Sequence, residues 1–188
     1  MDGKEFDRAV ARAKSPEQKV AWFGALLAHE TGLGSRLVIV GGSALEVYLT
    51  SARYVSADID IVGDKSIIIP TLQRWGFVRR EGRDHRIYWF KKNVGQVDLV
   101  SATDRSGLPS RTEPTPYGEV QLGAIEYVIV RRLMRAERER SSELFRQAEV
   151  LAAQYKRSLD WEYIASEAKH EGVLPLYRQL RKQILRPQ

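Results

Sequence analysis

The hydrophobic pattern of this chain has a helical period near its N-terminus, a strand period in its middle and a helical period again towards its C-terminus. Apolar side chains recur at helical spacing at Val20, Phe23, Leu26 and Leu27. The Ser15-Pro16 pair just before them is typical of a helix start. The pattern therefore predicts helices over 4–14 and 16–31.

Short apolar or alternating runs, separated by turn residues, occupy the middle of the chain. They predict strands at 36–41, 58–62, 77–81, 87–91 and 96–101, a short edge strand at 117–122, and helices at 44–50 and 66–75. The polar, proline-containing segment 103–116 predicts a loop.

From residue 124 onwards the pattern stays helical. Four helices are predicted there, at about 124–139, 141–156, 160–171 and 174–185. Strands in the middle and helices at both ends predict an α/β or α+β fold. We expect N-terminal helices over 1–34 that pack on a core over 35–122, followed by a helical region over 123–188.

Composition narrows the class of protein. The 188 residues include no Cys, which excludes disulfides and thiolate metal sites and fits a reducing compartment. We expect a cytoplasmic protein, because the sequence has neither a run long enough to span a membrane nor an apolar leader. The net charge of +6 favours polyanionic partners weakly.

Two carboxylates lie on one predicted strand, in the sequence Ser56-Ala57-Asp58-Ile59-Asp60-Ile61-Val62. Because strand side chains alternate between faces, Asp58 and Asp60 point the same way and the isoleucines point into the core. A third carboxylate, Asp98, interrupts the otherwise apolar run Val97–Val100. Burial of a carboxylate there costs several kcal/mol unless it is paired or bound to a metal.

A glycine turn precedes the paired carboxylates, because the apolar run 37–40 leads into Gly41-Gly42-Ser43. Gly41 and Gly42 have no Cβ atom, so a phosphate chain can approach the backbone closely. We expect Ser43 to cap a helix that begins at Ala44, to donate to a phosphate oxygen, or to do both.

If the strands are neighbours, the three carboxylates converge on one patch, and Mg²⁺ relieves their repulsion. Two such ions about 3.5–4 Å apart hold the attacking and leaving oxygens of a displacement in line. On this interpretation Asp58 and Asp60 are metal ligands, and Asp98 is either a ligand or the base for an acceptor hydroxyl.

This ordered set resembles the nucleotidyltransferase superfamily of the DNA polymerase β type, which combines a Gly-Gly-Ser or Gly-Ser turn, an Asp-x-Asp pair and a later acidic residue. The likeness covers about residues 36–101. Within the superfamily the chain looks most like the minimal, AbiEii-like toxin group, in which an Arg and then a Ser or Thr precede Asp-Ile-Asp. Arg53 and Ser56 occupy those places here.

The resemblance implies a mixed sheet flanked by helices and dependence on Mg²⁺ or Mn²⁺. It implies transfer of a nucleoside monophosphate from an NTP to a hydroxyl. It also implies that the nucleotide and its phosphates are bound by Gly41, Gly42, Ser43 and Arg53. The acceptor is RNA, tRNA included, a small molecule such as an antibiotic, or a protein. A toxin role would add an antitoxin protein as a partner.

Other interpretations stay open. The same fold could bind nucleotide or RNA without turnover. The arginines from 131 to 146 are more typical of a solvated helix face than of a grip on phosphates, although 123–188 holds 13 Lys and Arg against 9 Asp and Glu. Tyr88, Trp89 and Phe90 are more typical of core packing than of a base-stacking platform.

Overall fold

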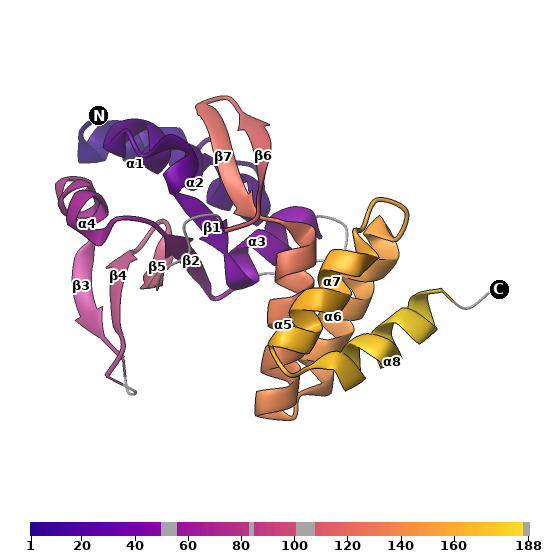
Figure 1. Ribbon diagram of the computed structural model, residues 1–188. Coiled ribbons are helices and arrows are strands. Elements are labelled where there is room, and N and C mark those ends of the chain that lie inside the picture. Colours follow the sequence, from indigo (N-terminus) through magenta and orange to yellow (C-terminus); the bar gives the residue numbers. More distant parts are fainter. Residues whose placement is uncertain (50–55, 83–84, 101–107, 186–188) are drawn as a thin grey trace. The chain divides into compact units, whose positions relative to one another are not determined.

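The chain divides into two units, Met1–Gly123 and Ala124–Gln188, and the described part of the first has a mixed sheet of seven strands at its centre. The computed structural model describes residues 1–49, 56–82, 85–100 and 108–185. The strands are β1 Val38–Val40, β2 Asp58–Val62, β3 Val78–Glu81, β4 Ile87–Lys91, β5 Gly95–Val100, β6 Ser110–Thr115 and β7 Gly118–Gly123 (Figure 1).

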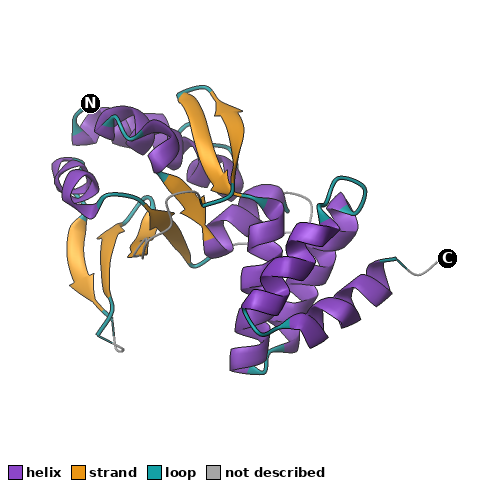
Figure 2. Cartoon of the chain, in the orientation of Figure 1, coloured by secondary structure: helices purple, strands orange, loops and turns teal. Residues whose placement is uncertain are grey.

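Their order across the sheet is β3-β4-β5-β2-β1-β7-β6. Two pairs are parallel, β2 with β5 and β1 with β7, and the other four pairs are antiparallel. The prediction of a mixed sheet flanked by helices is therefore confirmed (Figure 2). The topology places β5 directly beside β2, so residues about 40 positions apart in sequence become neighbours.

The helices of this unit are α1 Gly3–Val10, α2 Pro16–Thr31, α3 Gly41–Tyr48 and α4 Lys65–Arg74, with a short 3-10 turn at Gly34–Arg36. Side chains on one face of the sheet, including Ile39, Ile61 and Val97, are fully buried. Helix α2 approaches this face so closely that a Cβ on Gly24 would fall 2.4 Å from Ile39 Cδ1.

An aromatic cluster joins α1, α2 and the end of α4. Phe6 stacks on Trp75 with ring centroids 4.2 Å apart, and Phe23 and Phe77 pack around them. The ammonium of Lys91 on β4 lies 5.3 Å from the Phe6 ring centroid, which shows that this face of β4 points towards the helices.

The second unit consists of the helices α5 Ile125–Glu139, α6 Ser142–Tyr155, α7 Trp161–His170 and α8 Leu174–Ile184. Ser141 caps α6 by accepting a hydrogen bond from Leu144 N–H, and Asp160 caps α7 by accepting hydrogen bonds from Glu162 and Tyr163 N–H. Its buried apolar side chains include Ile129, Leu151 and Ile164, and Arg132 of α5 is also buried.

Two predictions near β6 are wrong. Segment 103–116 is not all loop, because Ser110–Thr115 is strand β6. The predicted edge strand at 117–122 is instead an interior strand, β7, with β1 on one side and β6 on the other. Within the described residues, no helix combines the length and the apolar character that crossing a membrane requires.

Candidate active site

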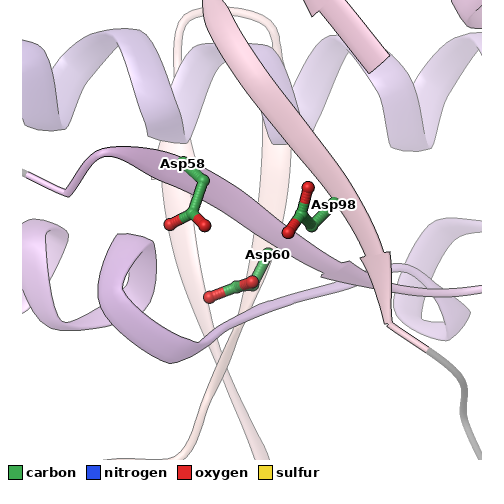
Figure 3. A group of neighbouring side chains, drawn as sticks. All are labelled: Asp58, Asp60 and Asp98. Atoms are coloured by element: carbon green, nitrogen blue, oxygen red, sulfur yellow. The ribbon is translucent and has the colours of Figure 1, made fainter. Parts of the chain in front are cut away.

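Three carboxylates meet on the face of the sheet opposite α2. Asp58 and Asp60 alternate with the buried Ile59 and Ile61 along β2, as the sequence predicts. Asp98 lies on β5, and the parallel register pairs it with Asp60. One carboxylate oxygen from each of the three residues lies within 4.8 Å of the other two (Figure 3).

Asp98 is 7% exposed, and polar side chains contact its carboxylate. Gln96, two residues earlier on the same face, donates its side-chain N–H to Asp98 Oδ1 at 3.0 Å. The Arg86 guanidinium, just before β4, lies 3.6 Å from Asp98 Oδ2. A buried carboxylate needs such partners because burial removes its hydration.

Gly41 begins α3 at the point where the chain passes Asp60. Its φ of +64° lies in the left-handed region that favours glycine, and a Cβ there would fall 2.0 Å from Asp60 Oδ2. The Asp60 carboxylate therefore lies at the N-terminus of α3. The unpaired N–H groups and positive dipole end of a helix stabilise negative charge at such a place.

Ser43 lies inside the first turn of α3 and is fully buried. The prediction that it caps a helix starting at Ala44 is wrong, because α3 starts at Gly41 and Val40 occupies the N-cap position without a side-chain hydrogen bond. Its hydroxyl donates to Val40 O at 2.9 Å and accepts from Asp60 N–H at 3.1 Å. In this structure Ser43 thus ties the glycine turn to the strand that carries Asp60.

A second tie runs from α3 to the start of β2. The buried Glu46 carboxylate accepts a hydrogen bond from Ser56 N–H at 2.7 Å. Ser56 Oγ in turn donates to Asp58 Oδ1 at 3.4 Å. Burial raises the pKa of Glu46 above its usual value, and the hydrogen bond from Ser56 opposes part of that rise.

The donor set suits a hard divalent cation. Mg²⁺ and Mn²⁺ prefer carboxylate oxygens, and three converging carboxylates supply them. Because Gly41 has no Cβ atom, the Asp60 carboxylate can lie against the backbone at the start of α3, where any larger residue would collide with it. The residues present therefore fit a hard divalent cation, which Asp58, Asp60 and Asp98 could hold.

The structure brings five of the predicted site residues together, namely Gly41, Ser43, Asp58, Asp60 and Asp98. Gly42 lies beside them in the first turn of α3. Arg53 falls outside the described residues.

Sequence reasoning missed four residues that shape the site: Glu46, Ser56 as a link to Glu46, Arg86 and Gln96. A signal existed for Gln96 alone, since a residue two positions before Asp98 on a strand shares its face. Arg86 precedes a strand that becomes a neighbour of β5 only through the sheet topology.

The chain has a nucleotidyltransferase-like fold. A crystal structure of an antigenic nucleotidyltransferase-like protein from Paracoccidioides brasiliensis matches 92% of this chain and 98% of its own, with a TM-score of 0.57 and 12% sequence identity. ANT(2″)-Ia in complex with adenylyl-2″-tobramycin matches 86% of this chain and 98% of its own, with a TM-score of 0.47 and 15% identity. No sequence family and no curated protein matches the chain.

Proposed function

We propose that this protein is a metal-dependent nucleotidyltransferase, which moves a nucleoside monophosphate from an NTP to an acceptor hydroxyl. The observation that carries the proposal is the convergence of Asp58, Asp60 and Asp98 beside the N-terminus of α3. The nucleotidyltransferase-like fold supports it. Magnesium or manganese binding is part of the same proposal.

In the proposed reaction the acceptor oxygen attacks the α-phosphorus of the NTP. A new P–O bond forms, the bond from the α-phosphorus to the bridging oxygen of the β-phosphate breaks, and pyrophosphate leaves. When bound, the metal neutralises phosphate charge and lowers the cost of the developing negative charge.

We assign the other roles in the proposed reaction to residues of the chain. Asp58 and Asp60 hold the metal, and Asp98 either completes the ligand set or accepts the proton of the acceptor hydroxyl. Gly41 and Gly42 allow the triphosphate to approach the backbone at the N-terminus of α3. The Ser43 hydroxyl links the glycine turn to β2. Arg53 is proposed to hold a phosphate.

The finer assignments rest on the resemblance to the AbiEii-like group. They are an RNA acceptor such as tRNA and a toxin role with an antitoxin partner. The cytoplasmic location is proposed on other grounds, since the sequence has no Cys. The excess of Lys and Arg over residues 123–188 is compatible with an RNA acceptor.

The test is transfer of label from each α-³²P-labelled NTP to total tRNA in the presence of Mg²⁺ or Mn²⁺. The wild type is compared with an Asp58→Asn/Asp60→Asn variant, which keeps the side-chain size but removes two charges. Glu119→Gln, which changes an exposed carboxylate on β7, is the matched control. We expect transfer by the wild type and the control, and a loss of at least 100-fold in the double variant.

The outcomes separate the alternatives. Label on the protein itself would identify a protein acceptor. NTP binding that requires metal but releases no pyrophosphate with RNA, aminoglycoside or protein acceptors would favour a protein that binds without turnover. Absence of any metal-dependent NTP binding would refute the site assignment.

A further inference from the structure

Strands β4 and β3 continue the sheet beyond β5, which carries Asp98 (Figure 1). The β4–β5 register pairs Phe90 with Gln96 and Trp89 with Val97, so by continuation Tyr88 lies across from Asp98. The β3–β4 register then pairs Arg80 with Tyr88 and Val78 with Phe90. Neighbouring strands are about 4.8 Å apart, so this surface begins one strand from Asp98 and reaches about 10 Å from it.

Alternation along β4 separates its aromatic side chains into two roles. Trp89 is 5% exposed and lies on the face that packs against the helices. Tyr88 and Phe90 lie on the opposite face and are only half-buried. Val78, beside Phe90, is 50% exposed. The sheet therefore presents aromatic and apolar surface next to the carboxylates.

Two arginines flank these rings. The Arg80 guanidinium lies over the Phe90 ring, 5.1 Å from its centroid. Arg86 is 68% exposed, and its guanidinium reaches the same face as Asp98. Over the described part of the hairpin, 78–82 and 85–91, the one carboxylate is Glu81, which alternation places on the other face and which contacts His85. We call Arg80, Arg86, Tyr88 and Phe90 the aromatic–arginine surface.

We propose that the aromatic–arginine surface binds the unpaired end of a nucleic acid strand and leads its terminal hydroxyl to the carboxylates. This inference rests on the proposed transferase function and names its acceptor class. Aromatic rings stack on bases whatever their sequence, and arginines bind phosphates and stack on bases as well.

Two features favour a strand over the base of the bound NTP. Tyr88 and Phe90 are two residues apart on one strand, so their Cα atoms are separated by about 7 Å. That spacing offers places for two bases, whereas one NTP has a single base. The two arginines likewise offer cationic groups to more than one phosphate.

Binding is measured without catalysis, by fluorescence anisotropy of a 5′-fluorescein-labelled single-stranded RNA 12-mer in EDTA, with no NTP present. The full-length variants Tyr88→Leu, Phe90→Leu and Arg80→Ala are compared with Ile87→Ala and Arg79→Ala. The latter two change neighbouring residues of the same strands on the opposite face. Binding of each NTP with Mg²⁺ is measured separately.

We expect binding to weaken about 10-fold or more in Tyr88→Leu and in Phe90→Leu. Arg80→Ala should weaken binding and lower the slope of log K against log salt by about 0.7, the value for one lost phosphate contact on a single strand. Ile87→Ala and Arg79→Ala should bind within about 2-fold of the wild type. A duplex of the same length should bind more weakly, because its base faces are stacked.

Three results would overturn the proposal. They are no detectable binding of the 12-mer by the wild type, equal losses in the variants of both faces, and weaker NTP binding with unchanged 12-mer binding in Tyr88→Leu and Phe90→Leu. The last would assign the rings to the base of the NTP. Since the assay needs neither metal nor turnover, 12-mer binding with the expected dependence would stand even if label transfer failed.

Discussion

At the scale of single residues, the candidate site depends on how closely the backbone passes a carboxylate. Gly41 passes Asp60 with a positive φ, and both its conformation and the space beside it exclude a side chain. The two constraints have separate consequences. The conformation affects folding, whereas the space affects the Asp60 carboxylate and therefore the proposed metal.

Gly41→Ala should lower both stability and metal affinity. An alanine at positive φ costs about 1 kcal/mol, and the added Cβ must displace Asp60 Oδ2. The measurements are thermal unfolding and calorimetric titration with Mn²⁺.

Gly32→Ala is the matched control, because Gly32 has a φ of +65° and a Cβ added to it would meet no atom of the described residues within 4 Å. It should show the backbone cost alone and bind Mn²⁺ as the wild type does. Equal metal binding by the two variants would contradict the role given to Gly41.

Glu46 has a pKa raised mainly by burial, so it affects stability in a pH-dependent way. The folded protein keeps the Glu46 proton at pH values where the unfolded chain releases it. Stability is therefore lost as the pH rises from the unfolded pKa, near 4.5, through the folded one. Glutamine keeps an oxygen for Ser56 N–H and carries no charge.

Glu46→Gln should thus raise the melting temperature at pH 7.5 by a few degrees, the shift that about 1 kcal/mol produces in a chain of this size. The gain should shrink to nothing below pH 4. Glu139→Gln is the control of opposite sign, because hydrogen bonds from Arg135 and Arg138 lower the Glu139 pKa. A gain from Glu46→Gln that does not depend on pH would contradict this argument.

Local sequence rules predict on which face of a strand a side chain lies better than they predict which residue it contacts. Alternation along a strand was enough to place Asp58 and Asp60 on one face. The sequence predicts a cap at Ser43 because serine before an apolar run usually caps a helix. No local pattern indicates that Gly41-Gly42 itself forms the first turn. The contact of Arg86 with Asp98 depends on a strand pairing that no local pattern encodes.

At the scale of elements, strand β6 shows where hydrophobic patterning fails. Its sequence Ser-Arg-Thr-Glu-Pro-Thr has no apolar face, and proline is unfavourable inside a sheet. Pro114 is tolerated because, among the described strands, β6 lies at the edge of the sheet and pairs only with β7. The strand exists because β7, with the buried Val120 and Leu122, offers it a hydrogen-bonding edge.

The contact of α2 with the sheet gives a prediction for a helix-sheet interface. Gly24→Ala gains helix propensity of about 1 kcal/mol, but its Cβ would fall 2.4 Å from Ile39 Cδ1 and 2.7 Å from Val120 Cγ2. Overpacking of this kind costs about 1–3 kcal/mol, so the variant should be less stable by about 1 kcal/mol in urea unfolding.

Ile39→Val removes the Cδ1 atom and tests this explanation. In the Ile39→Val background Gly24→Ala should cost less than in the wild type, which a double-mutant cycle measures as a coupling of about 0.5 kcal/mol or more. Additive effects of the two substitutions would show that the close contact is not the cause.

At the scale of the whole molecule, the order of the strands in the sheet brings together residues whose proximity the sequence pattern does not predict. The paired carboxylates on β2 and the third on β5 come together because β5 returns parallel to β2, after the β3–β4 hairpin has extended the sheet on its far side. One topology therefore builds the carboxylate cluster and sets the aromatic–arginine surface beside it. The sequence predicts the individual strands, whereas the pairing of the strands determines which of their side chains lie close together.

This clustering has a cost to the folded chain that a metal should remove. Three carboxylates whose oxygens lie within 4.8 Å repel one another, and the unfolded chain does not share this repulsion. A cation that binds only the folded protein stabilises it by RT ln(1 + [L]/Kd), which is about 2.7 kcal/mol at 100 times the Kd. Mg²⁺ or Mn²⁺ should therefore raise the melting temperature measured in EDTA by about 5–10 °C at saturating concentration.

The Asp58→Asn/Asp60→Asn variant tests this argument, because its melting temperature should differ from that of the wild type in opposite directions without and with metal. In EDTA it should melt above the wild type, because two of the three charges are gone. With Mg²⁺ or Mn²⁺ it should gain nothing, so the order of the two melting temperatures reverses. A variant that is less stable than the wild type in EDTA would show that the carboxylates are held by protein contacts sufficient to offset their repulsion, as Arg86 and Gln96 already do for Asp98. The same reversal should occur with either metal, since it arises from charge and not from a particular coordination geometry.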